Sequence, residues 1–326
     1  MQPLPESDLN HVLDHTRELW EELRGKRIFI TGGTGFFGCW LLESLQWAND
    51  HFQLGARATV LSRNPEKFAK KMPHLANNPS FQFIQGDVCN FDFPVGNYAF
   101  VIHAATEASA KLNQTDPQRM FDTIVEGTRR TVEFASTHGT KKFLLISSGA
   151  VYGTQPPEIS HIPEDYKGAP DPLNPLSAYG EGKRAAEMLC ALGALENGIE
   201  MKIARCFAFV GPLLPLDAHF AIGNFIRDAL NGGPIVIIGD GTPYRSYLYA
   251  ADLAIWLWTI LFKGKNCRPY NVGSDNSITI KNLSYLVRDS ISPGSEVKIL
   301  EQSCITRIPR QLIKKPIKSP FSILKT

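Results

Sequence analysis

A tyrosine, a lysine and a serine in the middle of the chain have the types and spacing for proton transfer to a hydroxyl group. Tyr179 and Lys183 stand four positions apart, so on a helix they share one face. A neighbouring ammonium stabilises phenolate and is expected to lower the tyrosine pKa from about 10 towards neutrality. The phenol then exchanges a proton with a substrate hydroxyl while a nicotinamide exchanges the hydride. Ser148 ends a predicted strand and is expected to supply a further hydrogen bond to the substrate oxygen.

Three glycines follow the first predicted strand and precede a predicted helix. Gly32, Gly35 and Gly38 allow a tight turn and let the backbone approach a pyrophosphate closely. The same turn aims the amides and the partial positive charge of the helix N-terminus at that anion. A glycine triplet alone is a weak signal, but its place between a strand and a helix indicates dinucleotide binding.

The residues after the second and third predicted strands bear on the choice of cofactor. No carboxylate stands at the end of the second strand, where an acid binds the ribose hydroxyls of NAD. Ser62 and Arg63 stand there instead, and an arginine pairs well with a 2′-phosphate. This favours NADP, with NAD as the alternative if Arg63 is a solvated loop residue. Asp87 ends the third strand, where its carboxylate can reach the adenine amino group.

Strands alternate with helical stretches over the first two thirds of the chain, which predicts an α/β fold with a doubly wound parallel sheet. The predicted strands are 27–31, 58–61, 81–84, 100–103, 142–147 and 201–205. An amphipathic helix is predicted over 7–24, ahead of the first strand, and another begins near Ala178. Beyond Phe207 proline and glycine are dense, which predicts a region of loops and short elements.

The composition bounds the class of protein. Of 326 residues, 43% are hydrophobic and 20% charged, which excludes a wholly disordered chain. A formal net charge of +2 gives no electrostatic case for nucleic acid. The longest largely apolar run, Leu253–Phe262, is too short to span ~30 Å of hydrocarbon, so no membrane is expected as partner. Six scattered cysteines predict reduced thiols in a cytoplasmic setting, and no metal site is expected.

Several motifs in order resemble the extended short-chain dehydrogenase/reductase family, in its nucleotide-sugar epimerase/dehydratase branch. The resemblance covers roughly residues 26–290. It rests on Thr31–Gly38, Gly86-Asp87, His103–Ala105, Ser147–Gly153, Tyr179-x-x-x-Lys183, Arg205, Gly211-Pro212, Gly239–Arg245, Asp252 and Tyr270–Ser274.

The resemblance implies an N-terminal helical extension at 1–25, an NAD(P)-binding Rossmann domain at 26–206 and a smaller, mainly substrate-binding α/β region at 207–326. The last region includes segments that return to the Rossmann sheet and a basic tail. A nucleoside-diphosphate sugar is the implied substrate. A homodimer is also implied, through the helices at 116–137 and 178–194.

Site roles carry over position by position. The implied catalytic residues are Ser148, Tyr179 and Lys183. The implied substrate-binding residues are Ser148, Asn224 and Arg245, with the arginine on the diphosphate. The implied cofactor-binding residues are Gly32, Thr34, Gly35, Phe36, Phe37, Gly38, Ser62, Arg63, Asp87, Val88, Ala104, Ala105, Tyr179 and Lys183.

One departure from the branch bears on the reaction. Its 4,6-dehydratases place Asp-Glu directly after the catalytic Ser or Thr, and its decarboxylases keep a Glu there, whereas this chain has Gly149-Ala150. Elimination needs a positioned acid and base, and neither residue is one. Hydride transfer needs neither, so a 4-epimerase or a 4-keto-sugar reductase is expected. Ile124 and Ala208 stand where the branch usually has asparagine, which leaves the sugar and some phosphate contacts open.

Other functions stay open at this point. A 4,6-dehydratase is disfavoured by Gly149-Ala150. A dinucleotide-binding protein without catalysis has no need of the serine, tyrosine and lysine, and a reductase of small carbonyls has no need of Arg245. The leading hypothesis is an NAD(P)-dependent enzyme that makes or remodels a deoxy or epimerised sugar for surface polysaccharide.

Overall fold

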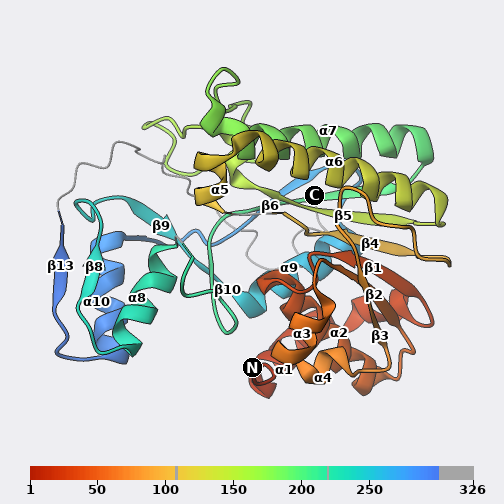
Figure 1. Ribbon diagram of the computed structural model, residues 1–326, viewed down its shortest axis with the longest axis horizontal. Coiled ribbons are helices and arrows are strands. Elements are labelled where there is room, and N and C mark those ends of the chain that lie inside the picture. Colours follow the sequence, from red (N-terminus) through yellow and green to blue (C-terminus); the bar gives the residue numbers. More distant parts are fainter. Residues whose placement is uncertain (107–108, 219, 301–326) are drawn as a thin grey trace.

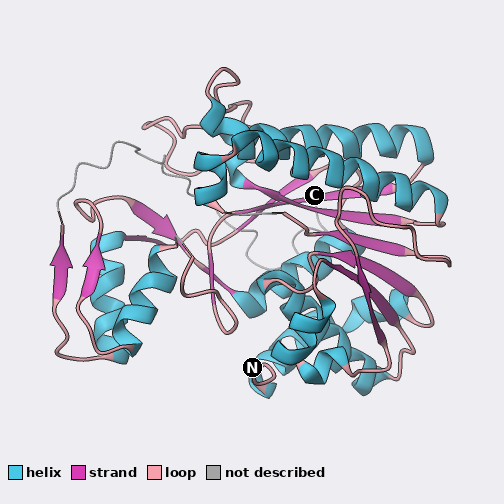
Figure 2. Cartoon of the chain, viewed as in Figure 1, coloured by secondary structure: helices cyan, strands magenta, loops and turns pink. Residues whose placement is uncertain are grey.

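A parallel sheet of seven strands forms the centre of the protein (Figures 1 and 2). The structure is a computed structural model, and it describes residues 1–106, 109–218 and 220–300. In sheet order the strands are β11 (Pro269–Val272), β6 (Glu200–Cys206), β5 (Lys142–Ser148), β4 (Phe100–His103), β1 (Arg27–Thr31), β2 (Arg57–Ser62) and β3 (Phe81–Gln85). The chain order changes direction between β1 and β4, and such a switch point opens a crevice at the carboxyl ends of the strands. The prediction of a doubly wound α/β fold is confirmed.

Alternating apolar side chains bury both faces of the sheet. Ile28 and Ile30 of β1 point into one core cluster and Phe29 into the other. On the first face pack α2 (Phe36–Phe52) and α9 (Ala250–Lys263). The second face is covered by α6 (Pro117–Thr137) and α7 (Ala178–Asn197), which lie side by side in Figure 1. These two layers hold the sheet rigid beneath its crevice.

The N-terminal segment packs on the α2–α9 layer. The helix predicted over 7–24 is present as α1 (Glu6–Thr16), which tightens into the three-ten helix η1 (Arg17–Leu23). Val12 and Trp20 are fully buried among the side chains of that layer. The Tyr249 hydroxyl also donates a hydrogen bond to Asp8 over 2.7 Å, which ties α1 to the chain just before α9.

Shorter elements complete the first two thirds of the chain. They are α3 (Pro65–Lys71), α4 (Pro73–Ala76), α5 (Ala110–Thr115), η2 (Gly149–Tyr152) and η3 (Pro175–Ser177). Of these, α5, η2 and η3 lie around the crevice. Within the described residues, no helix has the length and apolar character needed to cross a bilayer.

A smaller lobe lies to one side of the sheet, at the left of Figure 1. It contains α8 (Ala221–Leu230), α10 (Ile280–Ile291), β8 (Ile235–Ile237) and β13 (Val297–Ile299). Two strand pairs join it to the body: β7 (Phe209–Val210) with β10 (Leu248–Tyr249), and β9 (Tyr244–Ser246) with β12 (Ser277–Thr279).

The prediction of loops and short elements beyond Phe207 is wrong for the helices. Helices α8, α9 and α10 have 10, 14 and 12 residues. Apolar side chains at helical spacing give α8 and α10 a shared core, and twelve of the fourteen residues of α9 are buried. The prolines and glycines lie in the connections between these helices. The basic tail after 301 lies outside the described residues, and the domain boundaries stay predictions.

Candidate functional site

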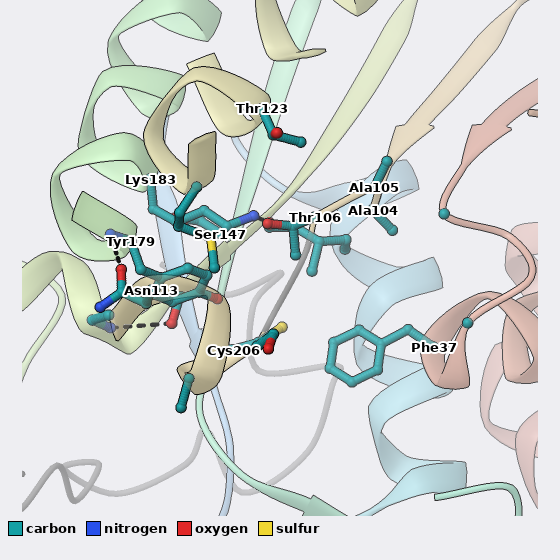
Figure 3. Close-up of a pocket in the computed structure, with 18 of the residues that line it drawn as sticks. Phe37, Ala104, Ala105, Thr106, Asn113, Thr123, Ser147, Tyr179, Lys183 and Cys206 are labelled. Atoms are coloured by element: carbon teal, nitrogen blue, oxygen red, sulfur yellow. Dashed lines mark hydrogen bonds between the residues drawn. The ribbon is translucent and has the colours of Figure 1, made fainter. Parts of the chain in front are cut away.

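A cavity of about 930 Å³ opens at the carboxyl ends of the central strands (Figure 3). It brings together nearly all of the predicted cofactor and catalytic residues, from β1, β2, β3, β4, β5 and α7. They are Gly32, Thr34, Gly35, Phe36, Phe37, Ser62, Arg63, Asp87, Val88, Ala104, Ala105, Ser148, Tyr179 and Lys183. The sequence motifs therefore converge on one site, although their roles there remain predictions.

The glycine turn leaves room for a ligand that approaches the backbone. Gly32 has φ +72°, and a Cβ on it would lie 2.5 Å from the carbonyl carbon of Ala104. Gly35 is the N-cap of α2 and offers no side-chain cap to the amides of the first turn. Thr106 Oγ1 is buried beside the cavity and meets no hydrogen-bond partner among the described residues. The helix amides without a side-chain cap, the tight glycine turn and the Thr106 hydroxyl without a partner all fit a bound dinucleotide.

The ends of β2 and β3 form another wall of the cavity. Ser62 is buried, and its hydroxyl accepts a hydrogen bond of 3.3 Å from the Asn64 amide. Arg63 is exposed beside it, and Asp87 accepts a hydrogen bond of 3.0 Å from the Cys89 amide. The wall thus presents one cation and one carboxylate, which suits the adenosine half of a dinucleotide.

The catalytic candidates meet where β5 faces α7. Ser148 ends β5, and its Oγ accepts a hydrogen bond of 3.2 Å from the Ala150 amide. Lys183 is 3% exposed, and its Nζ donates to the Ile146 carbonyl over 2.9 Å. Nζ lies 6.0 Å from the ring centre of Tyr179, one helical turn before it. Figure 3 shows both side chains pointing into the cavity from α7.

Burial sets the protonation of this pair. It lowers the pKa of Lys183 to about 8, because the ammonium has lost most of its water. Burial also raises the pKa of Tyr179, against the lowering effect of a hydrogen bond with Ser148. The expectation that Lys183 lowers the tyrosine pKa towards neutrality is therefore wrong for this structure, because desolvation of the phenol is the largest influence on that pKa. With its pKa raised, Tyr179 is a neutral phenol near pH 7.

Two features that the sequence did not single out hold Tyr179 in place. The Asn113 side chain, on α5, accepts a hydrogen bond of 3.1 Å from the Tyr179 amide and donates one of 2.8 Å to the Leu176 carbonyl. Gly180 lets α7 approach η2, since a Cβ there would lie 2.8 Å from the Ala150 carbonyl oxygen. A lone Asn far from the tyrosine in the chain carries no local signal of such a role.

A buried polar network lies beneath the site. Glu187, one turn after Lys183, accepts hydrogen bonds from Arg205 Nε and Nη2 over 2.9 and 2.7 Å. It also accepts one from Ser147 Oγ over 2.6 Å. Arg205 reaches on to the Tyr152 hydroxyl over 2.8 Å. The network fixes α7 to the ends of β5 and β6, so it sets the distance between the serine and the tyrosine.

Three predicted residues are not among those that line the cavity. Gly38 packs inside α2 against the glycine turn, where a Cβ would lie 2.3 Å from Gly33. Arg245 lies on β9, two positions before Tyr247, which does line the cavity. Burial lowers the pKa of Arg245. The Asn224 amide, on α8, is oriented to donate a hydrogen bond of 2.8 Å to the Ala218 carbonyl, at the cavity edge. The direct roles of Arg245 and Asn224 on the substrate stay predictions.

The two residues that replace the family's usual asparagines, Ile124 and Ala208, lie in different parts of the structure. Ile124 is buried on α6 and packs against Gly182 of α7, next to Lys183. Ala208 lines the cavity between the sheet and the smaller lobe. The first position therefore affects the packing of α6 against α7, and the second faces the cavity.

Comparison with known proteins agrees with this site. The model of the NAD dependent epimerase/dehydratase family matches residues 28–273. Among curated proteins, UDP-glucuronic acid decarboxylase 3 of Arabidopsis thaliana is 31% identical over 277 residues, which cover 85% of this chain and 78% of the relative. That relative is named a decarboxylase, whereas this chain has Gly149-Ala150 after Ser148.

Solved structures show the same fold. UDP-glucuronic acid 4-epimerase from Bacillus cereus, in complex with UDP-glucuronic acid and NAD, superposes with a TM-score of 0.74 at 23% identity, covering 92% of this chain and 93% of that one. A dTDP-glucose 4,6-dehydratase from Streptomyces venezuelae with NAD bound has a TM-score of 0.74 at 21% identity, covering 88% of each chain. Their activities differ while their fold is shared, so the site must decide the chemistry.

Proposed function

Because this chain belongs to the NAD dependent epimerase/dehydratase family, we propose that it transfers hydride to and from carbon 4 of a nucleoside-diphosphate sugar, without elimination. Two reactions fit: epimerisation at carbon 4, and reduction of a 4-keto sugar. Both need a proton donor on the reacting oxygen, and neither needs an acid or base at another carbon.

The residues that follow Ser148 carry this proposal. Ala150 lines the cavity at the place where the elimination enzymes of the branch have an acid, and Gly149 precedes it. Among the described residues that line the cavity, the carboxylates are Asp87, on the adenosine side, and Asp171, on the loop before α7. The Asp171 carboxylate accepts a hydrogen bond from the Leu173 amide, which ties it to its own loop. Dehydration and decarboxylation therefore lack their positioned group.

The chain's own residues divide the work of the step. A bound nicotinamide supplies or accepts the hydride. The Tyr179 phenol donates its proton to the oxygen on carbon 4 during reduction and becomes a phenolate, and that phenolate accepts the proton of the carbon-4 hydroxyl during oxidation. The Ser148 hydroxyl hydrogen-bonds the same oxygen and the tyrosine. The Lys183 ammonium, held by the Ile146 carbonyl, lies close enough to stabilise the phenolate that proton donation leaves.

Replacement of the tyrosine tests this division of roles. Tyr179→Phe removes the proton donor and keeps the ring, so turnover of nucleoside-diphosphate sugars is expected to fall by about 1,000-fold, within the range of general acid catalysis. Tyr285→Phe, on α10 in the smaller lobe, is the matched control and keeps full turnover. Turnover of Tyr179→Phe within a few-fold of the wild type would contradict the proposal.

We further propose NADP as the preferred dinucleotide. Arg63 supports it, since an exposed guanidinium on the cavity wall can form two hydrogen bonds to a 2′-phosphate. The solved relatives named above bind NAD, which makes NAD the alternative. Arg63→Ala should weaken NADPH binding by about tenfold and leave NADH binding unchanged. Equal loss for both dinucleotides would favour NAD.

A homodimer through α6 and α7 is also part of the proposal. Met188, Leu192 and Leu195 form an apolar stripe on α7, with 61%, 44% and 83% of their surface exposed. Such a stripe on the outer layer of the protein suits a second copy of the chain. Leu192→Glu should convert a dimer to monomers in light scattering, whereas Leu286→Glu, an exposed leucine on α10, should not.

The setting of the reaction remains the one predicted from the thiols. The five cysteines in the described residues are unpaired, in keeping with a reducing, cytoplasmic compartment. A role in surface polysaccharide synthesis stays a proposal that follows from the substrate class.

A further inference from the structure

The charges around the cavity bear on which sugar it accepts. Among the described residues that line it, the charged ones are Arg63, Asp87, Asp171 and Lys183. Arg63 and Asp87 follow β2 and β3, on the adenosine side. This leaves one cation and one carboxylate near the reacting hydroxyl, and the cation already has a partner.

That cation is Lys183, and its surroundings do not suit a substrate carboxylate. Its side chain is 3% exposed and its Nζ donates to the Ile146 carbonyl. The carboxylate is Asp171, which is exposed at the cavity and lies next to Pro170. Pro170 in turn packs against Gly180, adjacent to Tyr179, so the negative charge belongs to the sugar half of the site.

Of the neighbouring arginines, Arg245 is the predicted diphosphate ligand, and Arg205 and Arg184 are held by other groups. Arg205 pairs with Glu187 beneath the floor of the cavity. Arg184 points away from the cavity lining, where it donates to the Val151 and Gly168 carbonyls. Neither is positioned to meet an acid on the sugar.

The other polar side chains in the described lining of the cavity are uncharged. They include Thr106, Ser109, Asn113, Ser148, Thr154, Asn174, Ser177 and Tyr179. Hydroxyls and amides of this kind match the hydroxyl groups of a neutral sugar, whereas a carboxylate buried here would lose its water and gain no countercharge.

From this we infer that the cavity selects a nucleoside-diphosphate sugar with an uncharged ring and rejects the corresponding hexuronate. The inference rests on the proposed nucleotide-sugar function and narrows its substrate class. It separates this chain from relatives whose names specify UDP-glucuronic acid. The hexuronate would be rejected for two reasons: its carboxylate would find no cation to pair with, and the Asp171 carboxylate would repel it.

Calorimetric binding of UDP-glucose and UDP-glucuronic acid tests the inference. The full chain is titrated with each sugar nucleotide in the presence of saturating NADH and NADPH in turn, so that a reduced cofactor prevents oxidation of the sugar. UDP-glucose is expected to bind at least about 100-fold more tightly, because a charged group without its partner costs that much or more. Equal binding of the two, whether strong or undetectable, overturns the inference.

Two variants separate charge from shape. Asp171→Asn keeps an oxygen that accepts the hydrogen bond from the Leu173 amide, and it removes the negative charge. The preference for UDP-glucose over UDP-glucuronic acid should therefore fall about tenfold. Leu176→Arg adds a cation to the cavity wall at a position that is 46% exposed, and should raise UDP-glucuronic acid binding at least tenfold. Leu173→Arg, 89% exposed and outside the lining, is the matched control and should change neither affinity. A preference unchanged in both test variants overturns the inference.

The proposed hydride transfer and the inferred selectivity fail independently. Binding that favours UDP-glucose together with full turnover in Tyr179→Phe would remove the proposed chemistry and leave the selectivity. Loss of turnover in Tyr179→Phe together with tighter binding of UDP-glucuronic acid would do the reverse.

Discussion

Replacing Glu187 by glutamine removes the negative charge of the buried network and keeps the volume of the side chain. In the wild type the carboxylate accepts hydrogen bonds of 2.9 and 2.7 Å from Arg205 and one of 2.6 Å from Ser147. The side chains of Glu187 and Arg205 are 13% and 14% exposed, so water can replace few of the hydrogen bonds that are lost. The change therefore leaves a guanidinium below the site without its counterion.

The expected size of the effect follows from these contacts. An amide offers one oxygen, so Glu187→Gln keeps one acceptor and turns an NH₂ group towards a donor of Arg205. One charge-assisted hydrogen bond is lost, at about 1.5–3 kcal/mol, and a second is weakened by about 1 kcal/mol. We expect the free energy of unfolding to fall by about 3 kcal/mol, within the range for a broken buried ion pair. At about 2.1 cal/mol/K of unfolding entropy per residue, a chain of 326 residues loses roughly 4–5 °C in Tm for this change.

Chemical denaturation of a double-mutant cycle measures this energy. Arg205→Met leaves the Glu187 carboxylate without its main partner, and the double variant removes both charges. The double variant should lose at least about 2 kcal/mol less than the sum of the single losses, since each single change strands a charge. A loss below about 0.5 kcal/mol for Glu187→Gln, or additive losses in the cycle, would refute the role of this pair.

Three further predictions concern the cofactor end and the buried ionisable groups. Gly32→Ala should lower the free energy of unfolding by about 2–4 kcal/mol and weaken dinucleotide binding at least tenfold. Its control is Gly55→Ala: Gly55 has φ +63° and no atom within 4 Å of an added Cβ, so the loss measured by chemical denaturation should be only about 1 kcal/mol. Burial lowers the pKa of His103 to about 3 from 6.5, so between those values the unfolded chain binds a proton that the folded chain does not. The free energy of unfolding should therefore drop by about 2 kcal/mol more in the wild type than in His103→Gln between pH 7 and pH 5, and equal drops would contradict this. The Lys183 ammonium, with a pKa of about 8, should be lost as the pH rises through 8, so dinucleotide binding in fluorescence titration should weaken from pH 7 to pH 9 in the wild type and not in Lys183→Met.

Six of the seven strands of the central sheet, and the convergence of its motifs, were predictable from the chain. The seventh strand, β11, lies beyond Phe207, where the resemblance implied segments that return to the sheet without placing them. Each predicted strand is a short run rich in apolar residues, separated from the next strand by a helix or a loop. The position of the crevice follows from the order in which the parallel strands and helices alternate. Gly32 and Ser148 follow or end predicted strands and Lys183 lies near the start of a predicted helix, so their meeting in one cavity follows from the order of the elements.

Properties that depend on tertiary packing were not predictable. The direction of the Tyr179 pKa depends on how deeply α7 buries the phenol, which its four-residue spacing from Lys183 does not report. The ion pair of Glu187 with Arg205 joins a helix to a strand, and neither residue signals the other locally. In the smaller lobe, dense proline and glycine obscured helices whose cores form only when α8 meets α10.

The fate of a deuterium atom on carbon 4 tests the proposed hydride transfer most directly. UDP-[4-²H]glucose is incubated with the protein and NAD, and a 4-keto nucleotide sugar is incubated with NADPH deuterated at the nicotinamide; the products are read by NMR. Hydride transfer without elimination predicts a product with deuterium on carbon 4 and the oxygen on carbon 6 retained. Deuterium on carbon 6, or a product of UDP-glucose that has lost the oxygen on carbon 6, would contradict it and would show that Gly149-Ala150 does not prevent elimination.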